Sequence, residues 1–233
     1  MEKMLYLVWK ADTDSEADFA GRLLGPLARR ILDAGARRLR IAVADEDVAP
    51  AARLRLEASR PLPAGLVSIW ADTAVRRRPF EEALAAAVAR TAGYLVTESE
   101  PIVNTRHAVA DGQRTPGMCQ VAILRKPPRL SYESWLEIWL GSHTQIAIDT
   151  QSTFGYRQNV IVRPLTYAAP PYDAIVEEHF PAEAMTDQAV FYNAVGDDAK
   201  RKANRKAMND SIARFIDFDK IDVVPMSEYT MRS

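Results

Sequence analysis

Two kinds of hydrophobic spacing alternate along this chain, one typical of strands and the other of helices. Residues 4–9 form a short apolar run, and residues 38–44 alternate apolar and polar side chains as a half-buried strand does. Residues 14–34 instead carry apolar side chains three and four positions apart, the spacing of a helix with one buried face. Gly35 follows where a glycine commonly ends a helix. The further elements predicted in this half are a strand at 65–70, a helix at 79–91 and a strand from 94 to 97.

The second half of the chain repeats this order of elements. Ser131 is a plausible N-cap for its first helix, and Gly196 with Asp197 is a plausible break in its second. The predicted strands are 120–124, 156–162, 172–179 and 221–225, and the predicted helices are 131–148 and 186–216. Polar, turn-rich residues 104–117 separate the halves and predict a linker. We therefore expect an N-terminal unit at 1–103, a linker at 104–117 and a C-terminal unit at 118–233.

Each half has the element order β-α-β-β-α-β, which is that of a ferredoxin-like unit. Such a unit places both helices on one face of an antiparallel sheet and leaves the other face to be covered. Two units in tandem therefore predict an α+β fold in which the two antiparallel sheets pack face to face. The expected result is an α+β barrel formed within one chain, with a cavity between its sheets.

Composition narrows the class of protein. The 233 residues are 48% apolar and 26% charged, with a formal net charge of -1, which is typical of an ordinary soluble protein without a nucleic-acid partner. No apolar run approaches the roughly 20 residues of a membrane span, and the N-terminus lacks a signal-peptide pattern, so a cytoplasmic location is expected. Cys119 is the single cysteine, and no Cys/His cluster occurs in the sequence. We therefore expect Cys119 to be buried packing and expect no metal site.

Candidate chemistry first appears on the predicted helix at 131–148. Trp135, Trp139 and His143 are spaced four residues apart and should share one helix face. The two tryptophans are expected to pack on the sheet. His143 is either a hydrogen-bonded or surface histidine near the helix end, or a general acid/base at the mouth of a cavity, since imidazole exchanges protons near neutral pH.

The predicted strand after Tyr172 separates its side chains by alternation. One face should carry Asp173, Ile175, Glu177 and His179 and line the barrel, and the other should meet the helices with Tyr172, Ala174, Val176, Glu178 and Phe180. The first set could support acid/base chemistry. Two simpler interpretations stay open: that Glu177 is paired with Arg157 or Arg163, and that Glu178 and His179 are solvated at an exposed strand end.

The second half resembles the EthD-like family of dimeric α+β barrel proteins over residues 118–228. The resemblance depends on four short segments: Trp139-Leu-Gly-Ser-His143, Tyr156-Arg-Gln-Asn159-Val160, Tyr172-Asp173-Ala-Ile-Val-Glu177 and Phe215-Ile216-Asp217. The chain departs from the family pattern at Ala174, where glycine is usual, and at His179, where an aromatic residue is usual. Ser211-Ile212 also replaces an acidic pair. The first half looks like a diverged copy that completes the barrel.

The resemblance implies a barrel fold and an association with breakdown of ethers and aromatic compounds or with polyketide pathways. The leading hypothesis is a cofactor-independent enzyme, a lyase, dehydratase, cyclase or oxidoreductase, acting on a small hydrophobic or aromatic oxygenated molecule. His143 would move a proton with help from Glu177 or His179. The residues expected to bind the substrate are Trp139, Tyr156, Asn159 and Asp173.

Two alternatives remain. One is a haem enzyme with His143 or His179 as axial ligand, as in other families built on this barrel. The other is a non-catalytic binding or accessory protein of an oxygenase system. No nucleotide motif occurs, so no nucleotide cofactor is expected. A tandem barrel supplies its own sheet–sheet interface, although a homodimer through exposed strand edges remains open.

Overall fold

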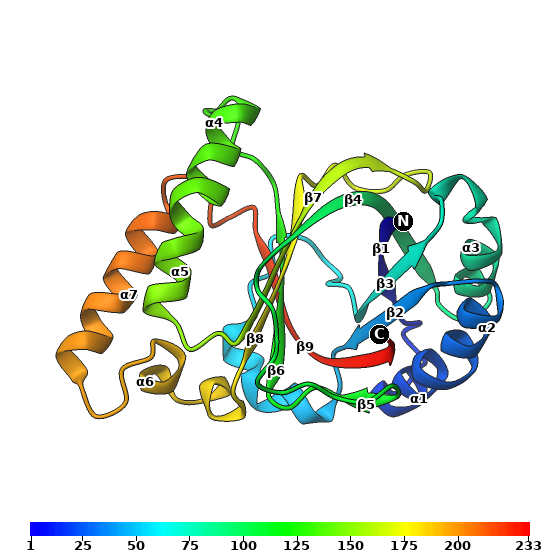
Figure 1. Ribbon diagram of the computed structural model, residues 1–233, viewed down its shortest axis with the longest axis horizontal. Helices are drawn as coiled ribbons and strands as arrows, with labels where there is room; N and C mark the ends of the chain where they lie inside the picture. Colours follow the sequence, from blue (N-terminus) through cyan, green and yellow to red (C-terminus); the bar gives the residue numbers. More distant parts are fainter.

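The computed structural model describes residues 1–233, and its strands form a closed antiparallel barrel (Figure 1). The strand order is β2-β3-β1-β4-β7-β8-β6-β9-β5, and β2 also pairs with β9, so eight strands close the barrel while β5 extends from β9. The strands are β1 Glu2–Trp9, β2 Arg38–Val43, β3 Gly65–Ala71, β4 Arg90–Ile102, β5 Gln113–Arg114, β6 Met118–Leu124, β7 Gly155–Pro164, β8 Ala174–Phe180 and β9 Asp222–Arg232. Closure leaves the eight barrel strands without a free edge. The predicted α+β barrel with antiparallel strands is confirmed.

Apart from the 3-10 helix Glu46–Leu54, whose Val48 and Ala51 pack against Phe180 of the second half, the helices form two groups on opposite sides of the barrel (Figure 1). Those of the first half are α1 Glu16–Arg22, the π-helical turn η1 Leu23–Leu27, α2 Ala28–Asp33, the 3-10 helices η2 Glu46–Leu54 and η3 Ala74–Arg76, and α3 Arg78–Ala85. Those of the second half are α4 Tyr132–Leu136, the π-helical turn η4 Glu137–His143, α5 Thr144–Thr150, the 3-10 helix η5 Ala182–Met185, α6 Gln188–Phe191 and α7 Asp198–Ile212. None of them is both long and apolar enough to cross a membrane.

The two halves repeat one strand order. The first half is ordered β2-β3-β1-β4 and the second β7-β8-β6-β9, which is the same sequence of second, third, first and fourth strand. Antiparallel pairing of β4 with β7 joins the halves, and pairing of β2 with β9 closes the ring. The order of elements predicted from the spacing of apolar residues is therefore right in both halves.

Several element boundaries differ from the prediction. The helix expected at 79–91 ends at Ala85, and β4 begins at Arg90, well before the expected strand start. Arg90 lies opposite Trp9 of β1, and its guanidinium stacks 3.6 Å from the centre of the tryptophan ring. Pairing with β1 therefore overrides the helical pattern at this end. The long helix expected at 186–216 is broken as predicted, since Gly196 adopts a φ of 76° and Asp197 caps α7.

Strand alternation sorts side chains into a barrel interior and an outer, helix-covered layer. The interior is filled by a cluster that includes Leu5, Leu7, Val121 and Ile175. Separate clusters lie where each helix group covers its sheet, and the C-terminal one contains Trp135. The space between the sheets, expected to be the binding cavity, is thus occupied by packed side chains. A large cavity lies instead between the C-terminal sheet and its helices.

Candidate functional site

A large cavity lies between the outer face of the C-terminal sheet and the helices that cover it. Its volume is about 750 Å³, and 18 of its 27 lining residues are hydrophobic, including Trp139, Met208 and Phe215. Strands β6, β7 and β8 form its floor, and η4 and α7 contribute its walls. A mostly apolar cavity of this size with a few polar groups is the usual form of a small-molecule site.

A π-helical turn positions His143 at this cavity. The backbone N–H of Thr144 donates to the carbonyl of Trp139, five residues earlier, and the Thr144 hydroxyl donates to the same carbonyl at 3.0 Å. Such widened turns interrupt the regular helical spacing and are frequent at functional sites. The rings of Trp135 and Trp139, which precede His143 by two and one helical turns respectively, have centres 5.1 Å apart. Both tryptophans are buried against the sheet, as predicted.

His143 is buried and neutral. Its Nδ1 lies 2.9 Å from the hydroxyl of Ser211 on α7, and its ring packs 4.6 Å from that of Phe215. Burial, with a smaller contribution from the nearby Arg214, lowers the pKa of His143 to about 4. The expected hydrogen-bonded histidine is therefore found, and it also lines the cavity, where its neutral imidazole can accept a proton or donate a hydrogen bond.

Glu178 is the functional candidate that the sequence did not single out. It sits on β8 between its cross-strand neighbours Gln120 of β6 and Tyr156 of β7, and all three line the cavity. Glu178 is only 7% exposed, and its Oε1 has no hydrogen-bond partner. Burial raises its pKa to about 7. Glu178 is the one charged residue among the side chains that strand alternation places toward the helices. That feature of the sequence could have singled it out as a functional candidate.

Two glutamines, Gln158 and Gln151, add further polar groups at or beside the cavity. Gln158 Nε2 donates to the Thr144 hydroxyl at 2.7 Å and to the phenol oxygen of Tyr156 at 3.1 Å. Burial, reinforced by Glu178, raises the pKa of Tyr156, so its phenol stays protonated. Gln151 also lines the cavity, and its buried Oε1 has no partner. A ligand here would meet a neutral imidazole, a phenol and a carboxyl group that titrates near neutrality.

The opposite face of the same sheet holds Glu177 inside the barrel. Its carboxylate accepts from Lys3 at 3.2 Å, from Asn159 at 3.0 Å and from Arg157 at 2.9 Å. Burial alone would raise the pKa of Glu177, but Arg157 and Lys3 outweigh that effect and lower it to about 2. The interpretation of Glu177 as a carboxylate paired with Arg157 is confirmed, and a group this acidic does not exchange protons at neutral pH.

The remaining predicted site residues are divided between several places. His179 lies inside the barrel and is 1% exposed, and Glu178 is also buried, so the expectation of a solvated strand end is wrong for both. Asp173 is half-buried and accepts from the backbone N–H of Lys126 at 2.7 Å, which holds the turn beside β8. Tyr172 packs in the barrel interior rather than against the helices, because it precedes the regular strand.

The predicted site residues are therefore not one constellation. Trp139, His143 and Tyr156 meet at the helix–sheet cavity, whereas Asn159, Glu177 and His179 lie in the barrel interior. The sheet separates the two groups. His143 therefore does not reach Glu177 or His179, the partners expected from the sequence.

Comparison with known proteins identifies the fold. No model of a known protein family matches the sequence, and no curated protein does. Among solved structures, an anthrone oxidase-like protein is similar with a TM-score of 0.57 and 8% identity, over 100% of this chain and 94% of that one. A candidate monooxygenase from Lactobacillus acidophilus is similar with a TM-score of 0.48 and 8% identity, over 99% and 96% of the two chains. The first likeness shows that this chain shares its closed α+β barrel fold with that protein.

Proposed function

We propose that this protein binds a small, largely apolar, oxygenated aromatic molecule in its helix–sheet cavity and abstracts a proton from it without a cofactor. The observation that carries this proposal is Glu178, a buried carboxyl with a free oxygen and a pKa of about 7 at the polar end of an apolar cavity. A general base is most effective when its pKa lies near the working pH. Leaving such a group unpaired is costly unless it serves a ligand.

The neighbouring groups fit the remaining roles. The carboxylate of Glu178 would take a proton from a carbon beside a carbonyl or from a phenol, and the electron pair would stay on the ligand as an enolate or phenolate. The protonated phenol of Tyr156 and the neutral His143 would donate hydrogen bonds to the oxygen on which this charge develops. Trp139, Phe215 and Met208 would hold the aromatic rings.

The fold likeness to an anthrone oxidase-like protein supplies a specific reaction to try. Oxidation of an anthrone by dioxygen begins with loss of a proton from the methylene carbon opposite the carbonyl. The resulting carbanion is oxidised by dioxygen, and one anthrone and one dioxygen give one anthraquinone and one water. The protein needs only to remove the proton, which Glu178 would do, and to stabilise the enolate oxygen, which Tyr156 and His143 would do.

Two more specific interpretations, one of the fold and one of the family, are part of this proposal. The repeated strand order supports describing the halves as tandem ferredoxin-like units. Residues 104–117, predicted as the linker between them, include β5, which pairs with β9. Convergence of Trp139, His143 and Tyr156 on one cavity supports an EthD-like affiliation of the second half, since these residues carried the resemblance.

The test combines binding with turnover in the full-length protein. Hydroxylated aromatic ketones, including an anthrone, are titrated while tryptophan fluorescence is followed, and dioxygen uptake and quinone absorbance are then recorded. We expect Glu178→Gln to bind within a few-fold of the wild type but to lose about 10²–10⁴-fold in turnover. Glu82→Gln is the matched control, since Glu82 lies on α3, is exposed and does not line the cavity.

The possible outcomes separate the alternatives. Unchanged turnover in Glu178→Gln would refute the acid/base role. Binding without any product from the wild type would leave a non-catalytic binding protein. A Soret band in the protein as purified would overturn the cofactor-free chemistry and make His143 and His179 candidate haem ligands.

A further inference from the structure

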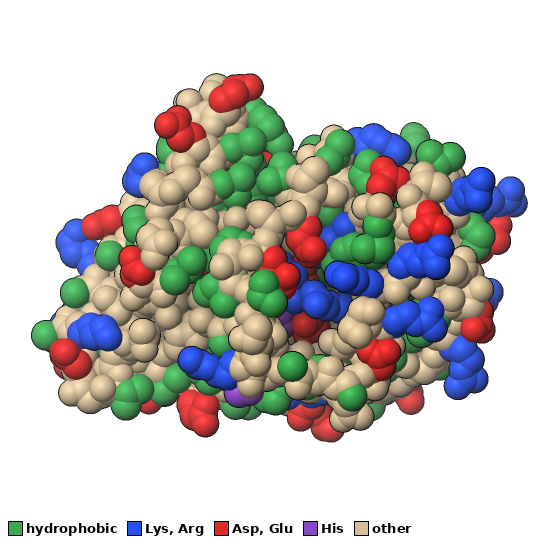
Figure 2. Space-filling view, viewed as in Figure 1, with side chains coloured by type: hydrophobic (Ala, Val, Ile, Leu, Met, Phe, Trp, Pro, Cys, Tyr) green, Lys and Arg blue, Asp and Glu red, His purple; other side chains and the backbone are tan.

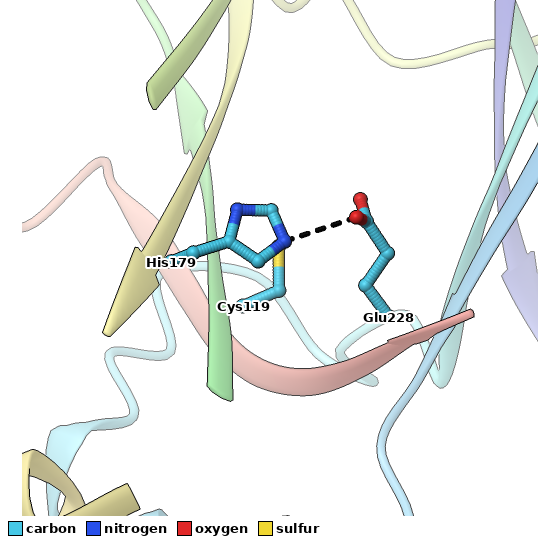
Figure 3. Close-up of side chains that lie close together, drawn as sticks. All are labelled: Cys119, His179 and Glu228. Carbon is cyan, nitrogen blue, oxygen red and sulfur yellow. Dashed lines mark ion pairs between the residues drawn. The ribbon is translucent and has the colours of Figure 1, made fainter. Parts of the chain in front are cut away.

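Three potential metal ligands from three strands converge inside the barrel (Figure 3). Cys119 of β6, His179 of β8 and Glu228 of β9 each offer one ligand atom, and these atoms all lie within 4.8 Å of one another. Cys119 and His179 are direct cross-strand neighbours. His179 Nε2 lies 3.0 Å from Glu228 Oε1. None of the three lines the helix–sheet cavity, so this cluster is separate from the site described above.

The imidazole of His179 lacks the hydrogen bonds that a buried histidine requires. The residue is 1% exposed, and neither Nδ1 nor Nε2 has a hydrogen-bond partner. The Nε2 nitrogen is near Glu228, but its direction does not satisfy a hydrogen bond to that carboxylate. An unsatisfied buried polar group costs free energy and calls for an explanation. A cation held between nitrogen, sulfur and oxygen would satisfy Nε2.

The charges around the cluster favour an added cation. The anionic side chains of this network exceed the cationic ones by one: the anions are Glu98, Glu100, Glu177 and Glu228, and the cations are Lys3, Arg40 and Arg157. A divalent ion bound with one thiolate adds a single positive charge. Glu98 and Glu100, whose side chains are 22% and 29% exposed, supply the excess, so the added charge would offset the negative charge at the edge of the barrel interior.

We propose that Cys119 Sγ, His179 Nε2 and a carboxylate oxygen of Glu228 bind one divalent metal ion of borderline softness, with Zn²⁺ as the best match. Zn²⁺ accepts thiolate, imidazole and carboxylate ligands together in four-coordinate sites, and water would take the fourth position. On binding, the Cys119 thiol loses its proton to solvent as the metal–sulfur bond forms. Arg157 contacts the other oxygen of Glu228 and orients that ligand.

The ion would link β6, β8 and β9 across the barrel interior. Because the cluster is buried, the metal would enter as the chain folds, and its binding would add to the stability of the fold. The expected metal-dependent property is therefore a higher unfolding temperature.

The decisive experiment uses Co²⁺ as a spectroscopic substitute for Zn²⁺. The full chain is unfolded with a chelator present, freed of the chelator, and refolded with Co²⁺ or Zn²⁺. Since Cys119 is the single cysteine, a thiolate-to-Co²⁺ charge-transfer band can come only from this residue. We expect one Co²⁺ per chain with that band, no band in Cys119→Ser, and at least tenfold weaker binding in His179→Gln. The control His107→Ala should bind as the wild type does.

A second measurement needs no variant and guards against a failure of the variants to fold. The X-ray absorption spectrum of the refolded, Zn²⁺-loaded wild type should show one sulfur at about 2.3 Å and otherwise nitrogen or oxygen ligands. Substoichiometric binding, a cobalt complex without the charge-transfer band, or a zinc shell without sulfur would overturn the proposal. The contact between His179 Nε2 and Glu228 Oε1 would then be one without a metal.

Discussion

Glu177 and Glu178 are chemically identical neighbours on β8, yet they lie in opposite environments. Glu177 points into the barrel, where Lys3, Arg157 and Asn159 contact its carboxylate and its pKa falls to about 2. Glu178 points toward the helices, where its Oε1 has no hydrogen-bond partner and burial raises its pKa to about 7. Both side chains are almost fully buried. Burial by itself therefore does not fix the behaviour of a carboxyl group, because its partners decide the sign of the shift.

The same contrast separates the two faces of the C-terminal sheet. The inner face carries a network of opposite charges that holds strands from both halves together, since Lys3 belongs to β1 and Arg157 to β7. The outer face leaves Glu178 Oε1 and Gln151 Oε1 without hydrogen-bond partners at a mostly apolar cavity that His143 also lines. The paired network around Glu177 thus has the character of a structural element, and the cavity on the outer face that of a binding site. His179 is the exception on the inner face, since its ring nitrogens have no hydrogen-bond partner. Figure 2 shows many charged side chains on the half of the surface that carries α1, α2 and α3.

The largest expected effect comes from breaking the inner network at Arg157. Arg157→Met would leave the buried carboxylates of Glu177 and Glu228 without their common partner. Removing one member of a buried ion pair typically costs about 3–5 kcal/mol. Chemical denaturation of the variant would measure this loss. The control Arg37→Ala removes a solvent-exposed pair with Asp72 and should leave the unfolding transition unchanged. Equal stability of Arg157→Met and wild type would show that the network contributes nothing.

The next largest expected change is in the free energy of unfolding, which should depend on pH through Glu178. The folded state holds its proton up to about pH 7, whereas the unfolded state releases it near the ordinary value of 4.5. Between these values the folded state binds more protons, so stability falls as pH rises, by about 3 kcal/mol in total. Glu178→Gln removes this loss and should be more stable than wild type at pH 8 but similar at pH 4. Denaturation at both pH values measures it, and Glu177→Gln should instead destabilise the protein at pH 8.

The smallest expected change is in the pKa of His143 when its hydrogen-bond partner Ser211 is replaced. The low pKa of His143, about 4, reflects burial without a carboxylate partner, since its Nδ1 faces a serine hydroxyl. Ser211→Asp would place a negative charge there and raise the pKa of His143 by about 1–3 units. NMR titration of the imidazole protons measures the change, with Ser211→Asn as the uncharged control. A pKa that stays near 4 in the aspartate variant would mean that burial alone governs His143.

Much of the fold follows from the spacing of apolar residues. Alternation along 38–44 and helical spacing along 14–34 predict their elements, and the repeated order predicts the closed barrel. The prediction is wrong where long-range pairing competes with local preference, as at Arg90, which joins β4 because it stacks on Trp9. The sequence also gives no sign of η2, whose Val48 and Ala51 pack against Phe180 more than a hundred residues later.

The candidate site was predicted only in part, for a related reason. Strand alternation correctly places Glu177 and His179 in the barrel and Val176 and Glu178 toward the helices. It cannot say which side holds the cavity, because that depends on how far the helices stand from the sheet. The interpretation that united His143 with Glu177 assumed a cavity between the sheets, where the structure has a packed interior.

Apolar periodicity along the chain is sufficient to predict the order of most elements, the barrel and the face on which most strand side chains lie, because periodicity is local and each strand or helix must bury its apolar side. Which buried polar groups are paired depends instead on contacts between distant segments. Cys119, His179 and Glu228 are far apart in the chain and meet because three strands bring them to one point of the barrel. The pKa of a carboxyl such as Glu178 likewise depends on neighbours from other strands and helices, and spacing along the chain does not reveal them.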